Sequence, residues 1–307
     1  MKVNLNINIL IIVMLSAMIL ISGATNPAAC GKKETLTFNT TALIMDFVEN
    51  APPKELVTGL RYPISLDIQN FGGYDIPPGK AQFYLSGLGE NLRSVEFIMR
   101  NTNNLQKRTT FNEGGKERVF FAQNAEPWKN FPNPYNITMK MESCYEYGTV
   151  VQSTLCIGIK NGVCNIDEEK IVSNSNSPAP IQITSIKEEI QGNKLYIILN
   201  VENKGIGEIY YTNTNCDKLI QRDLNEKQKQ NMFDINIETT ERDILCTLQN
   251  SEAPYGSKQG LSGAATLGKI TCVKVLTNED THAVPLQITL RYKYKEELSK
   301  TITILPS

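Results

Sequence analysis

Two stretches of the chain share a pattern of alternating apolar and polar residues that ends in a tight turn. Residues 66–76 read LDIQNFGGYDI, and residues 199–209 read LNVENKGIGEI. Alternation with a period of two predicts a half-buried strand. Asn-x-Gly predicts a reversal, because both residues tolerate positive φ. Since the copies lie 133 positions apart, the pattern predicts one module used twice.

A hairpin is predicted over residues 136–159. Tyr145 and Tyr147 share an apolar face of its first strand, and Cys144 lies on the opposite, polar face. In the return strand Cys156 also lies on the polar face, so a turn near Val150 would set the two cysteines opposite each other. We expect a cross-strand disulfide there, contributing about 3 kcal/mol by the loop-entropy model.

A second hairpin is predicted at the end of the chain, over residues 285–305. It repeats the tyrosine pattern of the first, with Arg291 at the position of Cys144 and Thr303 at that of Cys156. Both halves of the expected disulfide are therefore missing together, which supports their pairing.

The rest of the pattern predicts an all-β protein with two domains. The first domain is residues 42–164, and the second is residues 181–307. Between them residues 165–180 are polar and end in SNSNSPAP, a composition typical of a linker.

The first 24 residues have the charged start and apolar stretch of a secretory signal peptide or a membrane anchor. Small residues at positions 22–24 would permit cleavage there. Residues 25–41 are polar and predict a tether, with Cys30 as a candidate lipidation site after Ala28 and Ala29. Cleavage, lipid anchoring and a retained anchor all stay open, and each places the protein on the membrane outer face or outside the cell.

The composition narrows the function classes. The net charge of −1 gives no reason to expect nucleic acid as a partner, and the single histidine argues against a multi-histidine metal site. Seven cysteines with no Cys-x-x-Cys spacing favour disulfides in an exported protein over zinc or redox motifs. Cys246 and Cys272 are paired because they lie in successive strands; Cys164 and Cys216 are paired by elimination.

No sequence motif identifies a catalytic, cofactor-binding or metal-binding site. Residues 263–269 match the start of a phosphate-binding loop, but a strand follows where such a loop requires a helix. His282 has no partner suggested by sequence, and Trp128 is expected to pack at the end of the first domain. Asn39 and Asn136 are candidate glycosylation sites by pattern.

The two alternating motifs, ISLDIQNFG and LNVENKGIGE, resemble a strand of CARDB-type adhesion-related domains. The layout is similar to that of exported archaeal surface proteins, which share an opening like DFVENAPP and a Cys-Tyr-x-Tyr stretch. The resemblance implies two tandem immunoglobulin-like β-sandwich domains and brings no activity with it.

We therefore expect an exported binding or structural protein, an adhesion or envelope-assembly subunit without a catalytic site. Its expected partners are the membrane, through the N-terminal segment, and another protein at the cell surface. The alternative is a solute-binding lipoprotein or an enzyme with a site between the two domains.

Overall fold

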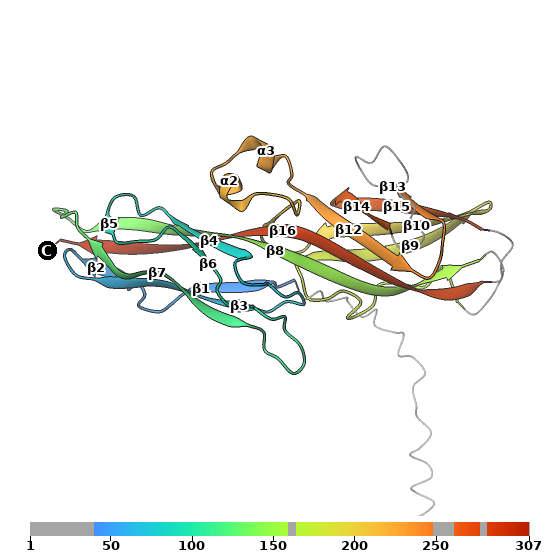
Figure 1. The fold of residues 1–307 in the computed structure, drawn as a ribbon, viewed down its shortest axis with the longest axis horizontal. Coiled ribbons are helices and arrows are strands. Elements are labelled where there is room, and N and C mark those ends of the chain that lie inside the picture. Colours follow the sequence, from blue (N-terminus) through green and yellow to red (C-terminus); the bar gives the residue numbers. More distant parts are fainter. Residues whose placement is uncertain (1–39, 159–163, 248–260, 277–280, 307) are drawn as a thin grey trace, which may run out of the picture. The chain divides into compact units, whose positions relative to one another are not determined.

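The computed structural model describes residues 40–158, 164–247, 261–276 and 281–306 (Figure 1). All of them belong to one compact unit, Thr37–Ser307. Their regular secondary structure is almost entirely β-strand, with two short helices, α2 (Cys216–Ile220) and α3 (Leu224–Lys227). The predicted all-β class is confirmed. The predicted signal or anchor, and all of the tether except its last two residues, lie outside the described residues.

Two very long strands organise this unit. β8 (Tyr135–Ile157) and β16 (His282–Leu305) pair antiparallel along their whole length, from His282 opposite Ile157 to Ile304 opposite Tyr135. Figure 1 shows them side by side, in green and red, across the whole width of the view. Both predicted hairpins are therefore wrong: each is a single strand that continues through the expected turn.

The physical reason lies in the residues at the expected turns. The stretch around Val150 has one glycine, Gly148, and no Asn-Gly or Asp-Gly pair, the dipeptides that favour a two-residue hairpin loop. Every odd-numbered side chain from Ile137 to Ile157 is buried or half-buried. The alternation of buried and exposed residues therefore continues through the expected turn with no change of register.

A central sheet is built outward from the two long strands. Its order is β14 (Leu261–Thr266), β12 (Met232–Thr239), β16, β8, β4 (Ala81–Ser86) and β6 (Ile98–Arg100). Two short strands also pair with β16, β11 (Glu208–Tyr210) and β2 (Glu55–Val57). On its edge away from β8, β16 thus pairs with β2 of the first half at its C-terminal end and with β12 and β11 of the second half before it.

Two four-stranded sheets accompany the central one. The first has the order β1 (Leu43–Phe47), β3 (Tyr62–Asn70), β7 (Lys116–Pro127) and β5 (Leu92–Arg93). The second has the order β9 (Ile181–Gln191), β10 (Lys194–Asn203), β15 (Gly268–Val275) and β13 (Ile244–Thr247).

Both small sheets lie on the same face of the central sheet. Tyr147 bonds to Asn70 at the end of β3, and Thr149 bonds to Ile181 at the start of β9. Because both are odd-numbered residues of one strand, they point to one face. The result is two sandwich-like halves that share the central sheet.

The two halves repeat one plan. A shift of 147 positions carries β8 onto β16, so that Tyr145 and Tyr147 correspond to Tyr292 and Tyr294. The order β8-β4-β6 is matched by β16-β12-β14, and β1-β3-β7-β5 by β9-β10-β15-β13. The centre of this pseudo-twofold arrangement is the directly opposed pair Glu146 and Lys293, whose charged atoms lie 3.5 Å apart.

Residues 165–180, predicted as a linker, pack against the sheet rather than spacing two bodies. Gln152 of β8 donates its N–H to Ser175 O at 2.8 Å. The ammonium of Lys170 lies 3.0 Å from the carboxylate of Glu188 in β9, and both side chains are almost fully buried. The predicted stretches 42–164 and 181–307 are therefore two halves of one unit, joined by two shared strands.

Among the described residues there are three disulfides, which indicate an oxidising, exported environment. The predicted Cys246–Cys272 pair is confirmed across neighbouring strands β13 and β15. The other two pairings are wrong: Cys144 joins Cys216 of α2, and Cys156 joins Cys164. Cys144 and Cys156 lie 12 residues apart on one strand, or about 40 Å, beyond the reach of a disulfide.

Candidate functional site

Four buried tyrosines surround the pseudo-twofold centre on the inner face of the central sheet. Tyr145 and Tyr147 come from β8, and Tyr292 and Tyr294 from β16; all four are fully buried. Neighbouring ring centroids lie 5.8 to 6.4 Å apart at steep interplanar angles, a favourable edge-to-face range. The quartet anchors both halves to the shared strands.

The first repeated turn anchors this quartet in the first half. Asn70 Oδ1 accepts from Gly72 N–H at 3.1 Å and from the hydroxyl of Tyr147 at 3.1 Å. A Cβ atom at Gly72 would overlap the hydroxyl oxygen of Tyr147. The glycine of the turn is therefore required for the close approach of the tyrosine.

The second repeated turn does the same in the other half. Asn203 Oδ1 accepts from Gly205 N–H at 3.1 Å, and Gly207 N–H donates to the hydroxyl of Tyr294 at 2.8 Å. A Cβ atom at Gly205 would overlap the hydroxyl oxygen of Tyr294. The repeat found in the sequence is therefore a repeated support for the tyrosines.

The two halves differ at one ionisable residue beside the quartet. In the first half this residue is Thr149, which is fully buried. Its hydroxyl donates to Ile181 O at 2.7 Å and lies 3.1 Å from the hydroxyl of Tyr292. Its counterpart 147 positions later is Glu296, whose carboxylate accepts from the hydroxyl of Tyr145 at 3.3 Å. A neutral side chain is thus replaced by a carboxyl group on the inner face.

Burial raises the pKa of Glu296 from 4.5 to about 7, and the hydrogen bond from Tyr145 opposes this only in part. The group can therefore gain or lose a proton near neutral pH. Burial also raises the pKa of Tyr145 well above its usual value, with the Glu296 charge acting in the same direction. Glu296 is the titrating group of this pair near neutral pH.

Glu296 lines a groove of about 300 Å³ where the halves meet. One wall is the start of β1 with Leu43 and Ile44, and another is the turn with Gly205 and Ile206. Ile206 is 95% exposed, so the groove has an apolar rim. Glu297 lines it as well as Glu296, but the carboxylate of Glu297 pairs with Lys140 at 3.2 Å. We call this the Glu296 groove.

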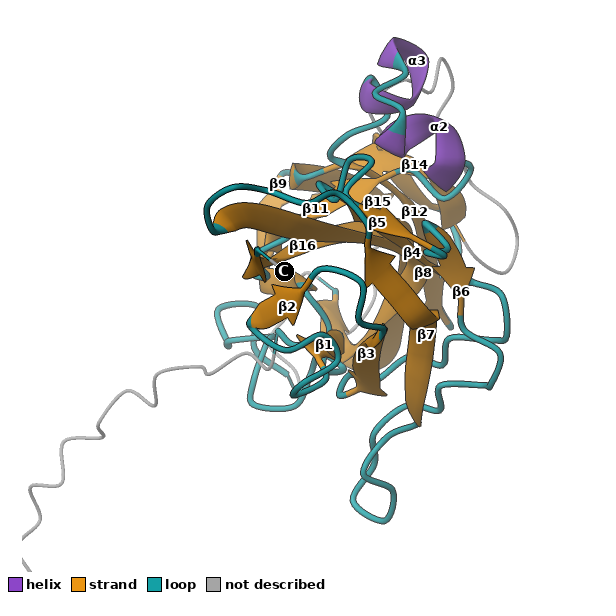
Figure 2. Cartoon of the chain, turned by 90° about the vertical axis from the view of Figure 1, so that its left-hand side faces the viewer, coloured by secondary structure: helices purple, strands orange, loops and turns teal. Residues whose placement is uncertain are grey.

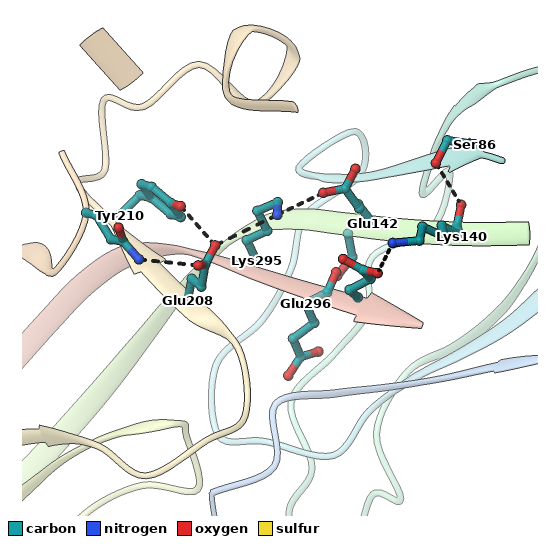
Figure 3. A network of polar contacts seen from close by, with 10 residues as sticks. Ser86, Lys140, Glu142, Glu208, Tyr210, Lys295 and Glu296 are labelled. Carbon is teal, nitrogen blue, oxygen red and sulfur yellow. Dashed lines mark hydrogen bonds and ion pairs between the residues drawn. The ribbon is translucent and has the colours of Figure 1, made fainter. Parts of the chain in front are cut away.

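The opposite face of the same strands carries a row of ion pairs. Lys295 lies 2.8 Å from the carboxylate of Glu142 and 3.8 Å from that of Glu208. Figure 3 shows Lys295 between these two carboxylates, with the side chain of Glu296 pointing the other way. Because the row is partly exposed, its pairs contribute little individually and mark a solvated face.

Helices α2 and α3 are held over the outer face of the central sheet. The Cys144–Cys216 disulfide ties α2 to β8. The hydroxyl of Tyr84 on β4 donates to Asp217 at 2.7 Å, and Figure 2 shows the two helices together in purple. The first half has no helix at the corresponding place among its described residues, so this excursion is a second departure from the repeat.

The end of the first half faces the viewer in Figure 2, near β2 and the C-terminus. It exposes large apolar side chains. Leu60 is 55% exposed, Trp128 41% and Tyr135 45%. The ring of Phe131 stacks on that of Tyr135 at 4.5 Å, and the guanidinium of Arg93 lies 4.8 Å from the centre of the Trp128 ring. We call Leu60, Trp128, Phe131 and Tyr135 the aromatic end.

Hydrogen bonds position Leu60 and Trp128 at this end. Gly59 N–H donates to Pro127 O at 2.9 Å, which brings Leu60 beside Trp128. Trp128 Nε1 donates to Glu90 O at 2.6 Å, so the ring is held in place although it is exposed. Trp128 was expected to pack at a domain end; it lies at that end with much of its ring open to solvent.

The remaining sequence candidates fall in separate places. Cys30 and Asn39 lie outside the described residues. Asn136 is exposed on β8 beside Tyr135 and accepts a hydrogen bond from Thr303 at 2.8 Å. The stretch resembling a phosphate-binding loop, predicted as a connector before a strand, forms parts of strands β14 and β15; the strand predicted after it is confirmed as β15.

The sequence suggested no partner for His282, which was expected in a loop; it begins strand β16 and has a partner. Its Nε2 lies 3.0 Å from a carboxylate oxygen of Glu241, which also pairs with Lys274 at 2.8 Å. Burial alone would raise the pKa of Glu241, but hydrogen bonds from Lys274 and His282 outweigh it and lower the pKa. The cluster stabilises the ionised carboxylate and leaves no unpaired base for catalysis at Glu241.

Sequence reasoning missed Glu296 because the strand was divided at the wrong place. The signal was present: Glu296 has the same parity as Tyr292 and Tyr294, which predicts an inner-face carboxyl once β16 is seen as one strand. Within the described ranges, no group of three or more His, Cys, Asp or Glu side chains could hold a metal ion. Nor does any described helix have the length and apolar character needed to span a membrane.

Comparisons with known proteins give this chain no family. No protein-family model matches it, and no curated protein does. Among solved structures, the secreted serine protease VesC from Vibrio cholerae is similar over 80% of this chain and 49% of its own length. The identity is 9% and the TM-score 0.19, so the likeness carries no argument about fold or activity. The chain spans about half the length of that structure.

Proposed function

We propose that the protein is an exported binding or structural protein of the cell surface, an adhesion or envelope-assembly subunit without a catalytic role. The observation that carries this proposal is the aromatic end. An exposed Trp and Tyr on this end, with the guanidinium of Arg93 beside the Trp ring, are the residue types enriched in protein-binding hot spots.

Two observations support a location at the cell surface. Three disulfides favour an oxidising compartment, and the apolar N-terminal stretch favours export with attachment to the membrane. The aromatic end would then serve as the surface for a protein partner outside the cell. From the resemblance of the repeated strands, we also propose that the two halves are related to CARDB-type immunoglobulin-like domains.

The geometry explains why this surface suits binding. Its side chains are already ordered, by the Trp128–Glu90 hydrogen bond and the stacking of Phe131 on Tyr135, so little side-chain entropy is lost when a partner docks. An N-linked glycan at Asn136 would lie at the border of the surface, beside Tyr135, and would limit the size of the partner.

Binding of the purified chain to intact cells of the source organism tests the proposal. The Trp128→Ala/Tyr135→Ala variant should bind at least about tenfold more weakly, because truncating a hot-spot residue costs about 2 kcal/mol or more. Phe111→Ala is the matched control, since Phe111 is fully exposed in the loop before β7. Equal binding by the double variant and the control would contradict the proposal.

The alternative function, a solute-binding lipoprotein or an enzyme with a site between the halves, has one observation in its favour. The Glu296 groove lies where the halves meet and contains a carboxyl group of raised pKa. A rise in melting temperature with amino acids, polyamines or sugars, abolished by Glu296→Gln, would favour it. No rise with any of these solutes would count against it.

A further inference from the structure

The two small sheets differ on the face that points away from the central sheet. In the first sheet this face is charged: Asp67 and Arg118 form an ion pair at 2.7 Å, and Asp46 lies directly opposite Asp67 on the neighbouring strand. In the second sheet the same face is largely apolar, and its apolar members are Tyr196, Ile198, Leu245, Val273 and Val275. We call these five residues the apolar face.

The strand register joins the apolar face into one surface. Val273 of β15 pairs with both Tyr196 of β10 and Leu245 of β13, so these three residues form a row across the sheet. Directly paired residues of antiparallel strands point to the same side, and Ile198 lies on that side one row further along β10. The alternate residues of β10 are buried on the inner side: Leu195, Ile197 and Leu199.

The described part of the chain leaves the apolar face open. Leu245 is 43% exposed and Val275 is 52% exposed. Tyr196, Ile198 and Val273 are half-buried within the sheet. Single exposed apolar residues are common on soluble proteins, but a contiguous apolar surface marks an interaction site.

Two opposite charges border the apolar face along β9. Glu189 pairs with Tyr196, and Lys187 pairs with Ile198, so the two charges lie on the same side of the sheet as the apolar face. Both side chains are exposed. The border therefore carries a negative charge at one row and a positive charge at the next.

We propose that the apolar face binds a second copy of this chain, sheet against sheet. A twofold axis between the two sheets, perpendicular to their strands, passes between the rows of Tyr196 and Ile198. It sets Tyr196 against Ile198 of the partner subunit, and Glu189 against Lys187 of the partner subunit. Each contact occurs twice, so the interface has an apolar centre and two ion pairs at its border.

The charge pattern favours a second copy over other partners. A twofold interface uses the same surface on both subunits, so that surface must be complementary to itself. Opposite charges one row apart, on either side of the axis, meet this condition. The outer face of the first small sheet does not, because the carboxylate of Asp67 is already paired with Arg118.

The size of the apolar face suits a weak dimer. β10 and β15 pair over eight residues in a four-stranded sheet. With strands about 4.8 Å apart and about 3.3 Å per residue, such a face covers on the order of 500 Å² per copy. The total of about 1,000 Å² is at the lower limit for a specific interface. We therefore expect a dissociation constant in the micromolar range.

Sedimentation equilibrium of the purified chain beginning at Thr25 tests the proposal. Lys187→Glu and Glu189→Lys each set like charges against one another, so each should weaken dimerisation about tenfold or more. The double variant Lys187→Glu/Glu189→Lys restores both ion pairs with their signs exchanged. It should dimerise as strongly as the parent.

Leu245→Lys tests the apolar part of the interface. It buries a charge on each side of the interface and should weaken dimerisation about tenfold or more. The matched control is Ile44→Lys on the outer face of the first small sheet, where Ile44 is 37% exposed. This control should dimerise as the parent does. If Leu245→Lys does not fold, the charge variants decide.

Three results would overturn the proposal. The first is a parent chain that stays monomeric up to about 100 µM, where a micromolar dimer would be nearly complete. The second is a double charge variant that dimerises no better than the single variants. The third is a dimer that a folded Leu245→Lys variant forms as strongly as the parent. Trp128→Ala/Tyr135→Ala should leave dimerisation unchanged, so the aromatic end is tested separately.

Discussion

The corner of the molecule around Thr149 and the corner around Glu296 have one backbone plan and different chemistry. In the first, Thr149 is fully buried and hydrogen-bonded, and residues 175–177 cover the strand edge. In the second, a carboxyl group occupies the same position beside an open groove. The comparison indicates that the repeated turns and tyrosines stabilise the fold in both halves. The side chains at the positions between them differ in charge and burial.

The Cys144–Cys216 disulfide is the departure from the repeat with the largest expected effect. It closes a loop of 72 residues that has no covalent counterpart at Arg291 in the other half. Cys144→Ala/Cys216→Ala should lower the free energy of unfolding by about 4 kcal/mol by loop entropy. Urea unfolding measures this, with Cys156→Ala/Cys164→Ala as the control, whose shorter loop predicts about 2.5 kcal/mol. Equal losses would contradict the entropic account.

Glu296 should make stability depend on pH in a way that Thr149 cannot. Its pKa is raised by burial from 4.5 in the unfolded chain to about 7, so the folded state holds the proton more tightly. The stabilisation is present below about pH 4.5 and is lost as pH rises towards 7. The groups that face the carboxyl are the hydroxyl of Tyr145 and, at longer range, Tyr147 and Tyr294.

Glu296→Gln removes that dependence. Above pH 7 the variant should be more stable than the parent by about 2 kcal/mol, and below about pH 4 the two should be equal. Denaturant midpoints measured from pH 4 to pH 8 show the difference. A parent stability that rises between pH 4.5 and 7 relative to the variant would have the wrong sign for a buried carboxyl.

The paired tyrosines should show the smallest difference between the halves. Tyr147→Phe leaves Asn70 Oδ1 without one buried donor, and Tyr294→Phe leaves Gly207 N–H without its acceptor. Each should cost about 1–2 kcal/mol. Tyr135→Phe, at an exposed hydroxyl, is the control. A loss in only one of the two variants would show that the turns are not equivalent supports.

The fold was predictable in part. Alternating strands, the repeated Asn-x-Gly turns and the Cys246–Cys272 pair follow from local rules of period and turn chemistry. The length of β8 and β16 could have been found from their unbroken parity. The Cys144–Cys216 pair could not, because it joins residues 72 positions apart through the placement of α2, which only the packed sheet determines.

The candidate site was harder to predict from the sequence than the fold. Glu296 is one of many glutamates, and its raised pKa comes from burial by the first strand and the second turn, distant elements of the chain. The aromatic end likewise depends on Gly59 meeting Pro127 across the sheet. No local sequence pattern predicts such contacts between distant segments.

Disulfide mapping of the unreduced protein tests most directly the claim that β8 and β16 are single, shared strands. Proteolysis without reduction, followed by mass spectrometry, should yield one peptide pair that joins Cys144 to Cys216 and another that joins Cys156 to Cys164. A peptide pair that joins Cys144 to Cys156 would require a hairpin turn within residues 135–157, and it would contradict the account.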